Sequence, residues 1–190
     1  LVRRGCLRTQ VVYFERDHAG EFRPADAYAA DSLATINTHD LPPLGGYWSG
    51  IDLRLRAAAG ALDRDSTLEE ALARREHEKA ALVRRFEADG APIDGPSLGL
   101  ALCRAGALML AASPAKVVAV GLDDLGEEEM PVNVPGLVAS ELPLWARRMH
   151  RDAAEILDTP AVSELIEDAV ERMDSRVPVV DVPIDGCLDL

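Results

Sequence analysis

Three short apolar runs, each followed at once by polar or acidic residues, place the strongest constraint on the fold of this chain. They are TQVVYFER (9–16), LATIN (33–37) and AKVVAVGL (115–122). Brief runs without apolar–polar alternation are typical of strands buried on both faces, as in parallel sheets. Helical patterns fill the intervals, so the sequence predicts an α/β fold. Because parallel strands end at one edge of a sheet or barrel, the residues after each run are expected to lie together.

The helical patterns have recognisable ends. Ser66-Thr67-Leu68-Glu69 has the form of a capping box and predicts a helix that runs to about Ala88. Ser97–Ala112 is almost entirely apolar and predicts a helix buried on most sides. Two further helices are predicted at Leu142–Leu157, with the indole of Trp145 packed inward, and at Thr159–Met173. The proline-broken segment 176–190 is expected to be an extended arm.

The composition of the chain argues against several classes of function and partner. The chain has 190 residues, 48% of them apolar, enough for one sizeable domain with its own core. A net charge of −13 repels phosphate backbones and anionic lipid, so neither nucleic acid nor a membrane surface is expected as a partner. The scattered Cys6, Cys103 and Cys187 favour a reducing cytoplasm over a disulfide framework. The chain begins with Leu1 rather than Met, which hints that residue 1 is not the natural start.

The ends of all three runs carry acidic residues, within Glu15-Arg16-Asp17, then His39-Asp40, then Asp123-Asp124. His39 and Asp40 can be interpreted in two ways. The pair could hold substrate hydroxyls at a strand end, or Asp40 could cap the following proline turn while His39 is a core side chain. Asn133, between two prolines in MPVNVPG, could face a ligand or belong to a simple turn. The acidic stretch 123–129 lacks the spacing of a calcium loop, and no metal site is expected.

Four segments, taken in order, resemble the carboxy-terminal blocks of the amylomaltase family, the 4-alpha-glucanotransferases or disproportionating enzymes. They are VVYFERDHAGEFRPADAY, LATINTHDLPPLGGYWSGIDL, VVAVGLDDLGEEEMPVNVPG and LPLWARR. The resemblance implies a (β/α)₈ TIM-type barrel in which the three runs are strands six to eight. Residues 1–190 would then form the C-terminal part of the catalytic barrel. A helical insertion is expected at about 52–96, and C-terminal helices and an arm at about 142–190.

The resemblance also implies roles for four residues. Asp40 matches the family's third catalytic carboxylate, which stabilises the transition state, and His39 matches the histidine that binds the same sugar ring. Asn133 falls at a sugar-contacting asparagine, and Asp124 matches an acid after the eighth strand that is expected to bind substrate. The implied activity is retaining transfer of α-1,4-glucan segments between maltooligosaccharides, without a cofactor or metal and in the cytoplasm.

Two catalytic groups of the family have no counterpart here. Its nucleophilic aspartate and acid/base glutamate lie on the fourth and fifth strands, before the part that this chain resembles. The chain alone is therefore expected to be inactive and to need the rest of the barrel, the N-terminal part of the same protein, as its partner. The alternatives are a non-catalytic remnant that binds maltooligosaccharide or a partner subunit, and a plain acidic interaction domain. Open sheet edges predict association or poor solubility of the isolated fragment.

Overall fold

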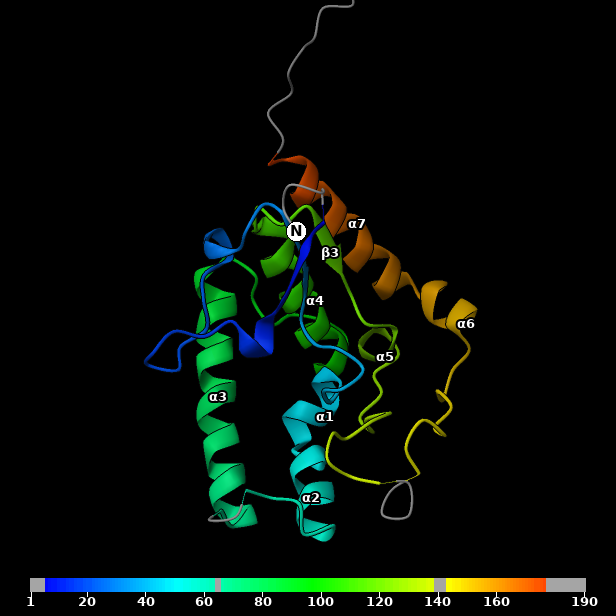
Figure 1. Ribbon diagram of the computed structural model, residues 1–190. Helices are drawn as coiled ribbons and strands as arrows, with labels where there is room; N and C mark the ends of the chain where they lie inside the picture. Colours follow the sequence, from blue (N-terminus) through cyan, green and yellow to red (C-terminus); the bar gives the residue numbers. More distant parts are fainter. Residues whose placement is uncertain (1–5, 64–65, 139–142, 177–190) are drawn as a thin grey trace, which may run out of the picture.

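The computed structural model describes residues 6–63, 66–138 and 143–176 (Figure 1). Its sheet consists of β1 (Arg8–Val11), β2 (Ser32–Thr35) and β3 (Val117–Ala119). Both pairings are parallel, and β2 lies between the other two. The register aligns Gln10 with Ala34 and Ala34 with Val118. The three apolar runs thus form parallel strands, as the sequence predicts, although each strand is shorter than its run.

The strands are less buried than expected. On β3, Val117 is 38% exposed, and the first two residues of β1 are exposed. In contrast, Ala34 on the central strand is fully buried. The difference arises because β1 and β3 are the edge strands of the sheet formed by the described residues. Each has a side without a neighbouring strand there.

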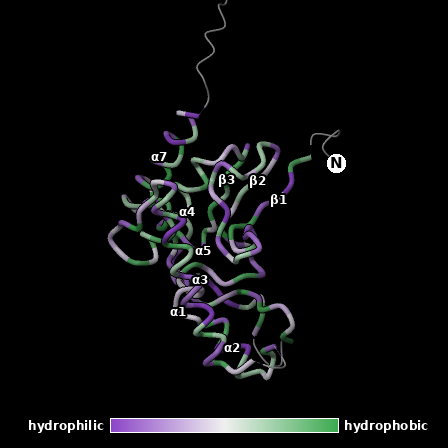
Figure 2. The backbone as a smooth tube through the Cα atoms, turned by 90° about the vertical axis from the view of Figure 1, so that its left-hand side faces the viewer, coloured by the Kyte–Doolittle hydropathy of each residue, from purple (hydrophilic) through white to green (hydrophobic). Residues whose placement is uncertain are grey.

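Four helices lie between β2 and β3 in sequence. They are α1 (Leu44–Ser49), α2 (Ile51–Ala58), α3 (Leu68–Ala88) and α4 (Leu98–Ala112). The capping box of α3 is one residue later than predicted, because Thr67 is the N-cap and Glu70 returns the hydrogen bond. The segment predicted as a helical insertion contains most of α2 and all of α3. Figures 1 and 2 show α2 at the end of the molecule opposite the start of the strands.

Helix α4 forms the centre of the core beside the sheet. Eleven of its 15 residues are buried, which matches its apolar sequence. Ile36, just after β2, packs directly on Gly106, where a Cβ atom would come within 2.3 Å of Ile36 Cδ1. Phe86 of α3 is also fully buried in this core. The end of β2 is thereby fixed against α4, which gives the loop after β2 a rigid base.

The C-terminal part contains α5 (Leu122–Leu125), α6 (Ala153–Leu157) and α7 (Pro160–Asp174). Helix α7 packs along α4, as Figure 1 shows. None of the helices in the described ranges is long and apolar enough to cross a membrane. The arm predicted at 176–190 lies outside the described residues from 177 onward.

The helix predicted at Leu142–Leu157 is wrong over most of its length, because within residues 143–157, the part that the structure describes, only α6 is helical. The inward-packing indole is wrong as well, since Trp145 is 62% exposed and has a left-handed φ of 59°. Backbone N–H groups of this segment bond to a neighbouring loop instead of to a helical turn. Trp145 N donates to Val132 O at 2.8 Å, and His150 N donates to Glu128 Oε1 at 2.6 Å.

Candidate functional site

A buried carboxylate joins the carboxyl ends of β2 and β3. Asp124, in the first turn of α5, is 2% exposed. Its Oδ1 accepts hydrogen bonds from Leu44 N at 2.6 Å and from Asn37 Nδ2 at 3.2 Å, and its Oδ2 lies 3.0 Å from the same amide nitrogen. Asn37 and Leu44 are the two ends of the loop that carries His39 and Asp40. One side chain therefore fixes both ends of that loop.

Burial raises the pKa of Asp124 to about 6. Hydrogen bonds from Leu44 N and Asn37 oppose this rise, while the neighbouring charge of Asp123 adds to it. The resemblance led us to expect that Asp124 contacts substrate directly. Both oxygens of Asp124 instead lie within hydrogen-bonding distance of donors of the chain itself and are covered. This arrangement favours a role in positioning the loop.

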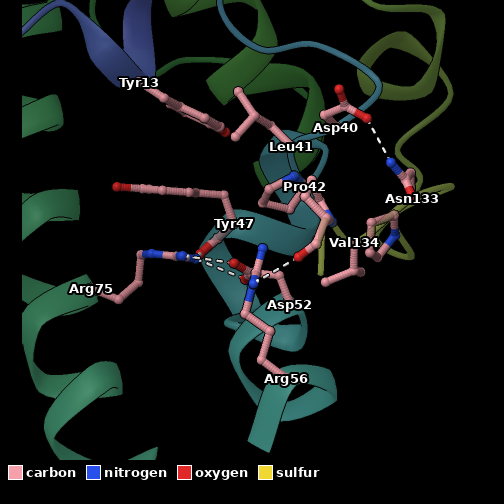
Figure 3. A pocket seen from close by; sticks show the side chains of 12 residues that line it. Tyr13, Asp40, Leu41, Pro42, Tyr47, Asp52, Arg56, Arg75, Asn133 and Val134 are labelled. Carbon is pink, nitrogen blue, oxygen red and sulfur yellow. Dashed lines mark hydrogen bonds and ion pairs between the residues drawn. The ribbon is translucent and has the colours of Figure 1, made fainter. Parts of the chain in front are cut away.

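Asp40 lies at the surface of this loop and is oriented from two sides. Its side chain is 49% exposed. Asn133 Nδ2 donates a hydrogen bond of 2.6 Å to Asp40 Oδ1 (Figure 3), and His39 Nε2 lies 3.5 Å from Asp40 Oδ2. The structure thus brings three of the four predicted site residues together, although Asn133 is 93 positions away from Asp40 in sequence.

The purely structural interpretation of His39 and Asp40 does not fit this geometry. His39 is 63% exposed, so it is not a core side chain. Asp40 lies within a turn, residues 38–41, that the backbone closes, because Leu41 N donates to Thr38 O at 2.9 Å. Thr38 Oγ1 also accepts from Asp40 N at 3.3 Å. The carboxylate and the imidazole are therefore held at the surface, where a ligand can reach them.

A cavity of about 120 Å³ lies beside Asp40 (Figure 3). Asp40, Leu41 and Asn133 line it on one side, and two stacked tyrosines, Tyr13 and Tyr47, line another. The tyrosine ring centroids are 4.4 Å apart. Burial raises the pKa of both hydroxyls well above the usual value, so both stay protonated at neutral pH. The cavity therefore combines aromatic surface with polar groups.

A buried ion pair, Asp52 with Arg75, supports this cavity. Arg75 Nη1 and Nη2 donate to the two oxygens of Asp52 at 3.0 and 2.8 Å, and Nη1 also donates to Tyr47 O at 2.7 Å. The guanidinium lies 3.8 Å from the Tyr47 ring centroid, and the Tyr47 hydroxyl donates to Glu78 at 2.6 Å. Sequence reasoning missed this group. Only the spacing of Arg75 and Glu78, three apart on α3, could have indicated it.

A second, wider hollow of about 400 Å³ lies at the carboxyl ends of β2 and β3. The loop with Thr38 and His39 forms one wall, and Gly121 to Asp123 at the start of α5 form another. His39 thus borders this hollow, whereas its neighbour Asp40 borders the smaller cavity. The loop after β2 separates two concave surfaces and presents a polar group to each.

The acidic stretch 123–129 takes part in ion pairs within the chain. Asp123 Oδ2 lies 2.7 Å from Arg147 Nη2, and the almost fully buried Glu128 contacts both Arg147 and His150. Among the described residues, no group of three or more His, Cys, Asp or Glu side chains is arranged to hold a metal ion. These contacts instead attach the segment 143–150 to the site.

A parallel sheet carries a reachable carboxylate, an imidazole and an amide beyond its strand ends, which defines an α/β protein with a cluster of hydrogen-bonding groups at that edge. Residues 1–154 match the family model of the 4-alpha-glucanotransferases, glycoside hydrolase 77. The chain therefore belongs to the 4-alpha-glucanotransferase family.

Individual relatives agree with this membership. The chain is 37% identical over 152 residues to a 4-alpha-glucanotransferase of Mycobacterium bovis, covering 76% of this chain and 20% of that protein. It is 30% identical over 159 residues to one of Haemophilus influenzae, covering 80% of this chain and 22% of that protein. The chain thus spans about a fifth of the length of these relatives.

The fold has a solved counterpart. An amylomaltase from Corynebacterium glutamicum superposes with a TM-score of 0.78 at 22% identity, covering 89% of this chain and 26% of that one. This similarity is one of fold.

Proposed function

We propose that the protein containing this chain is a 4-alpha-glucanotransferase that moves α-1,4-glucan segments between maltooligosaccharides. Family membership supports the reaction class. The observation that carries the proposal is the exposed Asp40 carboxylate, held by Asn133 at 2.6 Å with His39 beside it. A carboxylate accepts hydrogen bonds from sugar hydroxyls, an imidazole can donate or accept, and an amide can do both.

The proposed architecture is the back of a (β/α)₈ barrel, with β1, β2 and β3 as strands six to eight. The all-parallel pairing and sequential order of the strands support it. The site also lies at the carboxyl ends of the strands, where barrel enzymes carry their chemistry. The proposed architecture includes a helical insertion at about 52–96 and C-terminal helices and an arm at about 142–190. The remaining strands would pair with the free sides of β1 and β3.

The proposed mechanism gives Asp40 a role in the transition state. Retaining transfer needs a carboxylate nucleophile and a carboxylic acid on either side of the bond, with an oxocarbenium-like transition state. Those two groups would come from the remainder of the protein. Asp40 and His39 would grip hydroxyls of the reacting ring, and hydrogen bonds that shorten as the ring flattens lower the barrier selectively. Asn133 would keep Asp40 aimed at the ring.

The proposed setting is carbohydrate metabolism in the cytoplasm. Cys6 and Cys103 are both free thiols, one exposed and one buried, which fits a reducing compartment. The net charge of −13 does not oppose a neutral glucan, whereas it would repel nucleic acid.

The test is transfer by the full-length protein, with maltotriose as donor and acceptor and released glucose as readout. Asp40→Asn should lower kcat by about a thousandfold or more, because an interaction specific to the transition state is lost. The matched control is Asp26→Asn, since Asp26 is exposed in a short 3₁₀ turn (Ala25–Ala27) near the amino ends of the strands. Both variants should retain the wild-type melting temperature. Wild-type turnover by Asp40→Asn would refute the assignment, and binding of maltooligosaccharides by a wild type without transfer would favour the non-catalytic alternative.

A further inference from the structure

Trp145 is an unusual residue in two independent respects. Its side chain is 62% exposed, and its φ of 59° lies in the left-handed region. Large aromatic side chains gain most from burial, and residues with a Cβ atom rarely adopt positive φ. The other tryptophan, Trp48, is partly buried against the core, with Lys79 Nζ 5.1 Å from its ring centroid. At Trp145, therefore, a large aromatic side chain is exposed and the backbone is strained.

The backbone of Trp145 is held in place although its ring is exposed. Trp145 N donates to Val132 O at 2.8 Å, next to the asparagine that holds Asp40. Two residues later, Arg147 is 14% exposed and pairs with Asp123 at 2.7 Å and Glu128 at 3.0 Å. Because Glu128 is only 1% exposed, this pair anchors the segment into the interior. The backbone position of Trp145 is therefore fixed before any ligand arrives.

The indole lies beside the proposed sugar-binding group. Its centroid is 5.3 Å from that of the His39 ring, and the two planes are inclined by 51°. A tilted contact of this kind leaves most of the indole surface uncovered, in agreement with its exposure. Strained residues that the surrounding structure holds in place are concentrated at ligand-binding sites. Contact with His39 alone would need neither the exposure nor the strain.

We propose that Trp145 is a stacking platform for a glucose ring of the α-1,4-glucan, adjacent to the ring held by His39 and Asp40. This inference rests on the proposed function and names a further binding residue for it. The apolar C–H face of a pyranose ring can pack on an aromatic face, while its hydroxyls stay free for water and for polar groups. A rigid aromatic loses little conformational entropy when it binds. Trp145 thus binds a neighbouring glucose unit and takes no part in bond cleavage.

The kinetic test uses Trp145→Asn in the full-length protein. Asparagine tolerates positive φ, so the variant removes the ring and keeps the backbone conformation. With a series of maltooligosaccharides, we expect KM to rise about tenfold while kcat changes less than about threefold, because uniform binding is lost. Trp145→Tyr should restore most of the affinity. The control Trp48→Phe, at the other tryptophan, should leave both constants unchanged.

A binding experiment without turnover supports the kinetics. In full-length Asp40→Asn protein labelled with 5-fluorotryptophan, the ¹⁹F resonance that disappears in the Trp145→Asn background belongs to Trp145. Addition of maltohexaose should shift this resonance and leave that of Trp48 in place. A resonance that does not move would overturn the inference, since the ring would then be covered by another part of the protein or face only water.

The outcomes separate the two proposals. Absence of transfer by the wild type would refute the proposed function. Transfer by the wild type with an unchanged KM in Trp145→Asn would overturn the platform alone. A loss of kcat at constant KM would overturn it too, because Trp145 would then act only through His39.

Discussion

Asn37 donates its side-chain amide to the carboxylate of Asp124, with N–O distances of 3.0 and 3.2 Å, although 87 positions separate the two residues. The same carboxylate accepts the N–H of Leu44 at 2.6 Å. Residues 37 and 44 are the two ends of the loop that presents His39 and Asp40. A single buried side chain on α5 therefore determines the shape of a loop that follows a different strand.

The free energy of unfolding should depend on pH because Asp124 titrates with a raised pKa. Its pKa is about 6 in the folded protein, against an ordinary value of 3.8. Between these values the folded state binds more protons than the unfolded state, so the free energy of unfolding falls as pH rises. The protonated carboxyl contributes fully below about pH 4, and this contribution, roughly 3 kcal/mol, is lost as pH passes 6. Denaturant unfolding at pH 4, 5, 6 and 7 measures it.

Asp124→Asn is the control, because an amide of the same shape cannot titrate. The unfolding free energy of the wild type minus that of the variant should become smaller, or negative, as pH rises from 4 to 7. Parallel curves for the two proteins would contradict the raised pKa. All other titrating groups are common to both proteins and cancel in the difference.

The sequence was sufficient to predict the strands and the polar residues after them, because periodicity and strand-end position are local properties. It could not show that Asp124 is covered, since that depends on a backbone N–H from α1 and an amide from the loop after β2. The ion pair of Asp52 and Arg75 was missed for the same reason, because it joins two helices. Such contacts are products of tertiary packing.

The error at Leu142–Leu157 has a different origin. The segment has helical periodicity, but Glu128 takes the N–H of His150 and pairs with Arg147. Glu128 is only 1% exposed, so its charge needs hydrogen-bonding partners. The free energy gained by providing them exceeds the weak helix propensity of the segment. The structure of this region therefore depends on a buried acid, Glu128, whose burial the sequence analysis did not predict.

Replacement of Asn133 by aspartate should make transfer strongly dependent on pH. The amide donates to Asp40 at 2.6 Å, so Asn133→Asp would put two carboxylates in contact, and they could remain close only by sharing a proton. In the full-length protein we expect transfer near pH 7 to fall by about a hundredfold and to recover partly as pH is lowered. Asn133→Ala should lose activity at every pH alike. Identical pH profiles for the two variants would refute this explanation.

The buried pair under Tyr47 should dominate local stability. Asp52 and Arg75 are 7% and 8% exposed, and Arg75→Met would leave the carboxylate buried without its partner. The expected loss is about 3–5 kcal/mol in the free energy of unfolding. The double variant Asp52→Leu with Arg75→Met should recover most of it, because neither charge remains.

An exposed ion pair provides the comparison for that experiment. Arg84 and Glu21 lie 2.7 Å apart with side chains 58% and 51% exposed. Arg84→Met should cost less than about 1 kcal/mol, because water screens the pair. Equal losses in Arg75→Met and Arg84→Met would show that burial does not control the energetics here.

Gly46 in α1 should control the position of the loop that carries Asn133. A Cβ atom at Gly46 would lie 2.1 Å from the carbonyl oxygen of Glu129, so Gly46→Ala must push that backbone away from the helix. Gly45→Ala is the matched control, because it gains the same helix propensity and its Cβ atom would lie 3.2 Å from the Glu129 side chain and 3.3 Å from the carbonyl oxygen of Glu128, much farther from backbone than at Gly46. Gly46→Ala should cost about 1–3 kcal/mol and reduce transfer, whereas Gly45→Ala should stay within about 1 kcal/mol of wild type. Since the displaced backbone leads directly to Asn133, the hydrogen bond to Asp40 should weaken in the first variant only. Equal stability and equal kcat in the two alanine variants would mean that α1 does not set the geometry of this loop.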